Sequence, residues 1–310
     1  MGAWRWELFV DLSRLCALLL FLYCSLNINL YSISCGVILI MTFYFLDKRT
    51  TTTTQHGGIK KTTSDADDIP DKIVKKYTKS ILNLVLYDTE NCEALDQFEP
   101  VKANTHCVFA KTAKLWGSHD YDPALSLVEN TLRSVPAVIK FIAVSKYLKL
   151  DGFVFSLPGD EFGSDPDKFG EAVRTVLSVL SSADPSGYDC MSKSFIASAG
   201  WMFELDSEPI FVTTFAPCYP SRHSRYAFSA KHAFILLQPM HSFVTHDIGE
   251  DTPQTNWEKP RTVRDRIRVS YKQNDRPYLI RDTVRYPAVH DIVRGMDSMS
   301  DDPLPWWKPH

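Results

Sequence analysis

An uncharged apolar run near the N-terminus is the strongest constraint on how this chain can fold. Residues 15–46 contain no charged side chain, and only the Asn27-Ile28-Asn29 stretch interrupts their apolar character. As a single helix the run would extend about 48 Å at 1.5 Å per residue, whereas the hydrocarbon core of a bilayer is roughly 30 Å thick. We therefore expect a membrane anchor over residues 1–48. It is either a tilted single span that begins near Leu30 or a re-entrant hairpin broken at residues 27–29.

Basic residues around this run predict its orientation. Arg5 and Arg14 precede it, and Lys48, Arg49, Lys60 and Lys61 follow it. Because cytoplasmic flanks carry the excess of Lys and Arg, the chain after the run is expected in the cytosol for both topologies. A cleaved signal peptide would have a shorter apolar stretch and a small-residue cleavage site.

The remainder of the chain divides into a linker and one domain. Residues 49–68 include five consecutive threonines and a Gly57-Gly58 pair, a composition that cannot bury apolar surface and predicts a flexible linker. Residues 69–310 then form the globular domain, and the 45% apolar content of the chain is enough for a real core. The net charge of −3 gives no reason to expect nucleic acid as a partner.

Aspartate followed closely by proline predicts several helix starts, because aspartate caps the N-terminus and proline fits the first turn. The expected helices begin near Pro70, near Pro123 and at Pro166, with a further helix from Pro136 to about Leu148 and a basic helix over residues 261–272. Apolar runs predict strands over residues 152–158, 199–205, 209–215 and 233–238, with a hairpin turn at residues 206–208. The predicted fold class is α/β in the α+β sense: a single globular domain with a mixed, partly antiparallel sheet covered by helices.

The familiar catalytic signatures are missing. The sequence has no G-x-G-x-x-G, no Walker loop, no H-E-x-x-H and no G-x-S-x-G, and its seven cysteines show no C-x-x-C spacing. Dinucleotide, nucleoside-triphosphate, zinc and ordinary serine-hydrolase chemistry therefore lose their support.

Three motifs in a fixed order carry a resemblance instead. They occupy residues 105–111, 215–226 and 238–243, with Phe-Val-Phe at 153–155 and Gly-Trp-Met-Phe at 200–203 between them. This ordered set resembles the YqcI/YcgG family, and the C-terminal part resembles its eukaryotic branch. The resemblance implies a haem protein that N-hydroxylates a guanidino or amino-acid-like substrate. The chain departs from the bacterial pattern at Ala216 and at Gln238, so substrate specificity does not transfer.

Haem requires an axial donor, apolar walls and cations near its propionates. We prefer His241 as the iron ligand, because it follows an apolar strand and Gln238 offers an amide oxygen for its second ring nitrogen. His106 is the alternative, and Arg222 and Arg225 are candidates to hold the propionates or a substrate carboxylate.

Each of these residues also has an interpretation in which its role is purely structural. His241 also fits a core histidine satisfied by a carbonyl group, His106 fits the end of a strand over residues 108–109, and the two arginines fit a solvated loop. Cys107 and Cys218 are expected to be small buried hydrophobes rather than thiolate ligands.

The sequence therefore predicts a membrane-anchored haem-dependent monooxygenase that acts on a small-molecule substrate. A separate electron-donating reductase is implied, because the chain has no nucleotide-binding fingerprint. The alternative is a non-catalytic haem-binding or adaptor module at a membrane surface. The segment from Lys259 to Arg294 contains ten Lys or Arg and four Asp. It is expected to form a solvated surface or one that leans on anionic lipid, rather than a nucleic-acid interface.

Overall fold

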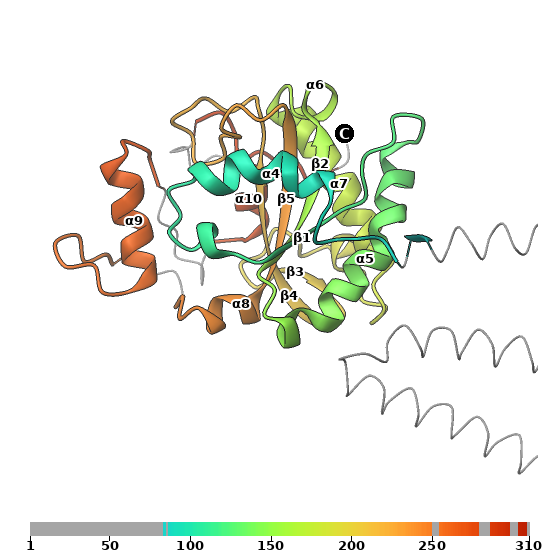
Figure 1. The fold of residues 1–310 in the computed structure, drawn as a ribbon, viewed down its shortest axis with the longest axis horizontal. Helices are drawn as coiled ribbons and strands as arrows, with labels where there is room; N and C mark the ends of the chain where they lie inside the picture. The colour runs from blue at the N-terminus through green and yellow to red at the C-terminus, as the bar shows by residue number, and fades with distance from the viewer. Residues whose placement is uncertain (1–82, 85, 250–253, 279–285, 298–302, 309–310) are drawn as a thin grey trace, which may run out of the picture. The chain divides into compact units, whose positions relative to one another are not determined.

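The structure is a computed structural model, and it describes residues 83–84, 86–249, 254–278, 286–297 and 303–308 (Figure 1). Residues Pro70–His310 form one compact unit. The expected anchor, the linker and the helix expected near Pro70 lie outside the described residues. Among the helices in the described ranges, none has the length and apolar character that crossing a bilayer requires.

A five-stranded mixed sheet forms the centre of this unit, in the order β1-β2-β5-β4-β3. The strands are β1 Leu115–Gly117, β2 Gly152–Pro158, β3 Phe203–Leu205, β4 Glu208–Phe215 and β5 His232–Pro239. Only β1 and β2 are parallel, and the other neighbours are antiparallel. The predicted mixed, partly antiparallel sheet and the β3–β4 hairpin are therefore confirmed.

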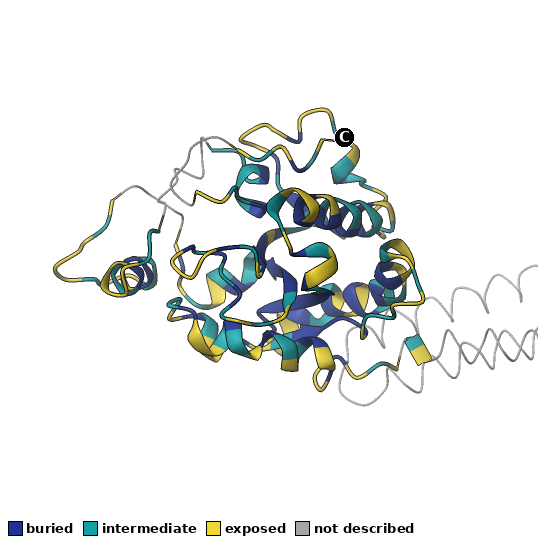
Figure 2. Ribbon diagram, turned by 90° about the horizontal axis from the view of Figure 1, so that it is seen from above, coloured by how far each residue is buried: buried dark blue, intermediate teal, exposed yellow. Residues whose placement is uncertain are grey.

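One face of the sheet carries most of the core. Helices α5 (Leu127–Leu148) and α7 (Pro166–Ser182) cover it, and they pack on alternate strand residues such as Phe153, Ile210 and Ile235. Asp165 caps α7 as predicted, because its side chain accepts a hydrogen bond from the backbone N–H of Lys168. Figure 2 shows buried residues along the strands and on the inner sides of these helices.

The other face of the sheet has a thinner cover. Helix α4 (Glu93–Asn104) packs Phe98 and Val101 against Val154, Phe234 and neighbouring residues of the sheet. This second core cluster is much smaller than the first. Part of the second face therefore remains open beyond the end of α4, where Phe211 is 37% exposed.

Two predictions about α5 were wrong. The helix begins at Leu127 rather than near Pro123, because Ser126 and Glu129 form a capping box at its N-terminus. It also continues through Pro136 as one helix. An internal proline costs about 3 kcal/mol, and packing against α7 and the sheet offsets that cost here.

Short elements connect the layers. They are η2 (Ala110–Thr112), α6 (Gly159–Phe162), η3 (Cys190–Ser192), α8 (Met240–Thr245) and α10 (Val289–Ile292), and the predicted basic helix is α9 (Val263–Gln273). The strand considered for residues 108–109 is not formed. Its place is taken by a turn that leads into η2, closed by a hydrogen bond from the Ala110 N–H to the Cys107 carbonyl.

Candidate functional site

His241 is held by a carboxylate. It lies in α8, directly after β5, and its Nδ1 is 3.0 Å from Oε1 of Glu208. The backbone N–H of His241 also donates to this oxygen, at 3.3 Å. Glu208 begins β4, and the pairing of Ile210 with Pro239 brings it beside α8. The sequence predicted that Gln238 would bond to the second ring nitrogen of His241. In the structure Glu208 takes that role, because the pairing of β4 with β5 brings its side chain next to the ring.

This contact defines what the His241 ring can do. A carboxylate accepts hydrogen bonds, so in the neutral imidazole the contact favours the proton on Nδ1 and leaves the lone pair on Nε2. Nε2 is buried and has no hydrogen-bond partner among the described residues. A neutral imidazole oriented by a carboxylate is the usual form of a metal-binding histidine. Nε2 of His241 therefore has the chemistry of an axial iron ligand.

A second histidine near α8 is oriented in the same way, and the sequence analysis missed it. Nε2 of His246 is 2.8 Å from Oδ1 of Asp151, whose side chain is buried. Asp151 also accepts hydrogen bonds from Ser242 and from the backbone of Lys114. The only sequence signal was an acidic residue just before a buried strand, which did not indicate a partner 95 positions away.

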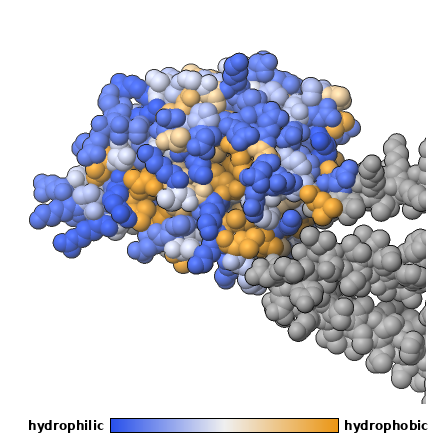
Figure 3. All heavy atoms as spheres, in the orientation of Figure 1, coloured by the Kyte–Doolittle hydropathy of each residue, from blue (hydrophilic) through white to orange (hydrophobic). Residues whose placement is uncertain are grey.

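Aromatic side chains lie next to these histidines. Phe243 of α8 contacts Phe211 and Phe109, and the ring of Phe109 is 4.6 Å from that of His246. Val244 is 80% exposed, so this apolar surface is open to solvent. Figure 3 views the molecule from the α4 side and shows apolar residues in patches among hydrophilic ones. The surface offers one wall for a flat apolar ligand such as haem.

A hollow among the described residues has a different character. It has a volume of about 790 Å³ and lies between α9 and the chain that follows α8. Its lining includes Asp247, Trp257, Arg264, Asp265 and Arg268. Because haem prefers apolar walls, this polar hollow does not fit the macrocycle.

His106 follows α4 in an irregular segment. Its ring lies edge-on to that of Tyr271 in α9, with the ring centroids 5.8 Å apart. Burial lowers the pKa of His106, and the cations Arg276 and Lys111 lower it further. The imidazole is therefore neutral near pH 7 and remains a possible ligand, although no described carboxylate orients it.

The surroundings of the cysteines near these sites do not favour the thiolate form. Burial raises the pKa of Cys107, and it raises that of Cys218 to about 11. Both thiols therefore keep their protons, although the two residues are half-buried rather than buried as expected. In the part of the chain that the structure describes, no three His, Cys, Asp or Glu side chains are grouped to hold a metal ion.

The two predicted arginines do not act together. Arg222 is exposed and pairs with Asp275 at 2.7 Å, so it matches the solvated-loop interpretation. Arg225 is buried, and its Nη2 donates to the backbone carbonyl of Asp291 at 2.6 Å. Arg222 is therefore not available to share a ligand with Arg225.

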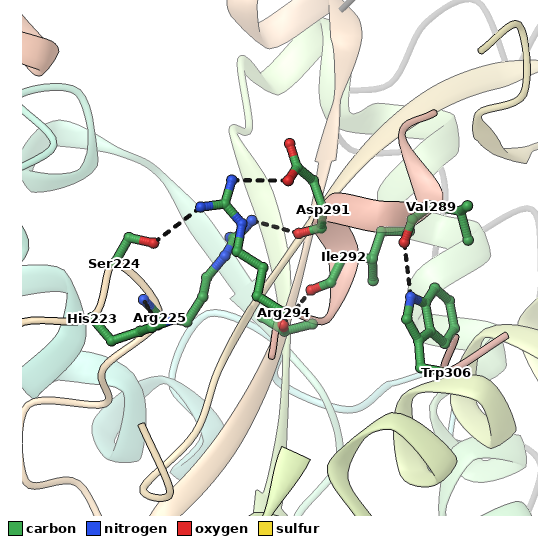
Figure 4. A network of polar contacts seen from close by, with 9 residues as sticks. His223, Ser224, Arg225, Val289, Asp291, Ile292, Arg294 and Trp306 are labelled. Carbon is green, nitrogen blue, oxygen red and sulfur yellow. Dashed lines mark hydrogen bonds and ion pairs between the residues drawn. The ribbon is translucent and has the colours of Figure 1, made fainter. Parts of the chain in front are cut away.

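Arg225 belongs to a network with the C-terminal segment (Figure 4). Arg294 pairs with the Asp291 carboxylate at 2.9 Å and donates to Ser224 at 3.4 Å. His223 lies in the same turn and accepts a hydrogen bond from the Arg225 backbone. Its pKa falls to about 3, because it is buried and both arginines disfavour its charged form.

The predicted site residues fall into two groups. His241 lies beside the first residue of β4, whereas Arg225 bonds to Ala216 just past its last residue. The eight residues of β4 span roughly 23 Å, so these groups lie at opposite ends of the strand. By contrast, Tyr271 contacts His106 and also interacts electrostatically with Arg225. Tyr271 thus links His106 to the electrostatic surroundings of Arg225, whereas His241 lies at the other end of β4.

Comparison with known proteins gives one result. No curated protein and no solved structure matches the chain. The model of the YqcI/YcgG family matches residues 99–279, which is more than half of the chain. That range contains the C-terminal half of α4, all five strands and α9, together with His106, Arg225 and His241. The chain belongs to the YqcI/YcgG family.

Proposed function

We propose that this protein is a haem-dependent monooxygenase that N-hydroxylates a small guanidino or amino-acid-like substrate. The observation that carries the proposal is the buried, unpartnered Nε2 of His241, with Glu208 bonded to the opposite ring nitrogen. Membership of the YqcI/YcgG family supports it. The donor type and the oriented ring both fit an iron ligand.

Each residue then has a defined role. Nε2 of His241 would hold the iron, and bound haem would supply the activation of oxygen. Glu208 keeps the proton on Nδ1, fixes the ring orientation and increases the basicity of the ligating nitrogen. Phe211 and Phe243 supply apolar contact on the open surface beside α8. A separate reductase delivers the electrons, because the sequence has no flavin or nicotinamide fingerprint.

The location of the reaction is also part of the proposal. The apolar run at residues 15–46 would anchor the chain in a membrane, and the basic residues after it place the domain in the cytosol. The partners are then the membrane, a reductase and a small-molecule substrate.

A second candidate function is a non-catalytic haem-binding or adaptor module at a membrane surface. It is favoured by the open apolar surface beside α8, where Val244 is 80% exposed, and by the polar lining of the 790 Å³ hollow. A monooxygenase needs an enclosed site that excludes water from the reaction.

Absorption spectroscopy of the purified full-length chain tests the proposal. We expect a Soret band in stoichiometric amount, either as isolated or after addition of haem. A chain that stays colourless after haem reconstitution removes both candidate functions that involve haem. Oxygen consumption with a reductase and guanidino amino acids then separates the enzyme from the non-catalytic module, which would bind haem without consuming oxygen.

A further inference from the structure

A buried guanidinium that forms no ion pair with any described carboxylate lies at the far end of β4 from His241. Arg225 is only 7% exposed, and its side chain donates to the backbone carbonyl of Asp291. Its Nε is buried and has no hydrogen-bond partner. None of the described carboxylates forms an ion pair with it, since the Asp291 carboxylate is bonded to Arg294.

Such an arrangement is costly unless an anion completes it. A buried charge loses its hydration, and a single carbonyl dipole compensates only part of that loss. Proteins therefore pair buried arginines with carboxylate or phosphate groups, which match the guanidinium fork. Burial lowers the pKa of Arg225 to about 10, and the neighbouring Arg294 contributes to the decrease. The Arg225 guanidinium is thus still charged near pH 7.

The surroundings of Arg225 are positive rather than neutral. Arg294 is a second partly buried guanidinium, with a side chain that is 13% exposed and a buried Nε that also has no partner. Asp291 provides one carboxylate for the two arginines, and Asp297, which acts on His223, is exposed. His223 adds no negative charge. Two cations and one close carboxylate leave an excess positive charge among the described residues.

We infer that Arg225 and Arg294 together bind a carboxylate group of a ligand. The site joins two parts of the chain, because Arg225 lies within the range of the family match and Arg294 lies beyond it. Tyr219 fixes the junction by donating to the carbonyl of Arg294 at 2.7 Å, and Thr214 donates to the carbonyl of Ile292. Figure 4 shows both guanidinium groups beside Asp291, with Ser224 and His223 on the facing loop.

The carboxylate can come from two sources, a haem propionate or a free amino-acid-like molecule. Only the first source rests on the proposed function. With iron on His241, a propionate at Arg225 would have to cross the length of β4, so the free carboxylate is then the occupant. A propionate at Arg225 instead fits iron on His106, whose ring contacts Tyr271, a residue that Arg225 affects electrostatically.

A titration of the full-length chain with sodium acetate, against sodium chloride at constant ionic strength, tests the free-carboxylate source. A ligand that binds only the folded state raises Tm in a saturable manner. We expect this rise in the wild type and at least about a tenfold weaker apparent affinity in Arg294→Gln, which loses charge-assisted hydrogen bonds. Arg222→Gln is the matched control, because it removes an exposed arginine from the same loop and should bind acetate like the wild type.

The propionate source is tested with haem and its dimethyl ester, which has no free carboxylate. If a propionate occupies the site, haem produces a Soret band and raises Tm, the ester binds at least about tenfold more weakly, and Arg294→Gln removes the difference. Should Arg294→Gln fail to fold, Arg294→Lys keeps the charge and should show intermediate affinity.

The outcomes distinguish the proposed carboxylate site at Arg225 and Arg294 from the proposed haem function. A saturable acetate response that depends on Arg294 supports the site even in a chain that never binds haem. Equal weakening in Arg222→Gln and Arg294→Gln would show only general charge attraction and overturn the site. The absence of both an acetate response and a difference between haem and its ester would also overturn it.

Discussion

Nδ1 of His241 lies 3.0 Å from Oε1 of Glu208, although the two residues are 33 positions apart in the sequence. The antiparallel pairing of β4 with β5 creates this contact. It turns a single histidine at the end of a strand into an oriented imidazole with one nitrogen left for a ligand.

The axial ligand is the first prediction. His241→Ala should abolish haem retention or change the Soret and ligand-field bands, because it removes the oriented nitrogen. His106→Ala should leave the ferric spectrum largely intact. Absorption spectra of the two purified variants check this. The reverse pattern would assign the iron to His106, and two unchanged spectra would show that neither histidine binds it.

Glu208 provides a second prediction, because under the proposed function it would act on the iron only through His241. Glu208→Gln should weaken haem binding by about tenfold to a hundredfold while the chain remains folded. Haem titration followed at the Soret band measures the effect. Glu204→Gln, in the neighbouring strand β3, is the control and should bind haem normally. Equal affinity in both variants would show that Glu208 does not support a ligand.

The C-terminal segment depends on a small residue in α7. A Cβ at Gly170 would approach Cβ of Trp306 to 2.7 Å, and Trp306 anchors the segment by donating to the Val289 carbonyl. In Gly170→Ala this clash should lower the free energy of unfolding by about 1–3 kcal/mol. The higher helix propensity of alanine offsets about 1 kcal/mol of that loss. Urea unfolding measures the change.

Gly200 is the matched control for that experiment. A Cβ at this position would meet no atom within 4 Å, so Gly200→Ala should leave stability nearly unchanged. If Gly170→Ala is as stable as Gly200→Ala, the packing of Trp306 on α7 is not tight.

His223 predicts a loss of stability in acid. Its pKa is about 3 in the folded chain and near 6.5 as a free side chain, so between these values the unfolded chain holds more protons. The free energy of unfolding therefore falls as the pH decreases from about 6.5 towards 3, by on the order of a few kcal/mol for this group. Urea unfolding at pH 7, 5.5 and 4.5 should show this decrease, and His223→Gln should flatten it. An unchanged slope in the variant would exclude His223 as its source.

The membrane anchor yields the last prediction. If residues 1–48 anchor the chain as proposed, deleting them should release it from the membrane fraction without unfolding it, because the linker expected over residues 49–68 would separate the anchor from the domain. Fractionation and circular dichroism check both parts. Aggregation of the shortened chain would mean that the apolar segment belongs to the core.

The sequence by itself determined the local structure wherever a short-range signal was strong. Asp165 and Pro166 predicted the start of α7, and the apolar run before Pro158 predicted β2, because caps and burial patterns act within a few residues. The same logic failed at Pro136, where long-range packing keeps α5 continuous. It failed again near Pro123, where the capping box at Ser126 starts the helix.

Only the tertiary structure decided how the site residues are combined. His241, His106 and Arg225 stand out in the sequence, but their partners Glu208, Tyr271 and Asp291 come from other elements of the fold. Arg222 and Arg225, three residues apart, separate into an exposed ion pair and a buried network. Hydrogen-bond partners depend on strand pairing and on where the chain returns, and residue spacing does not encode either of these over tens of positions.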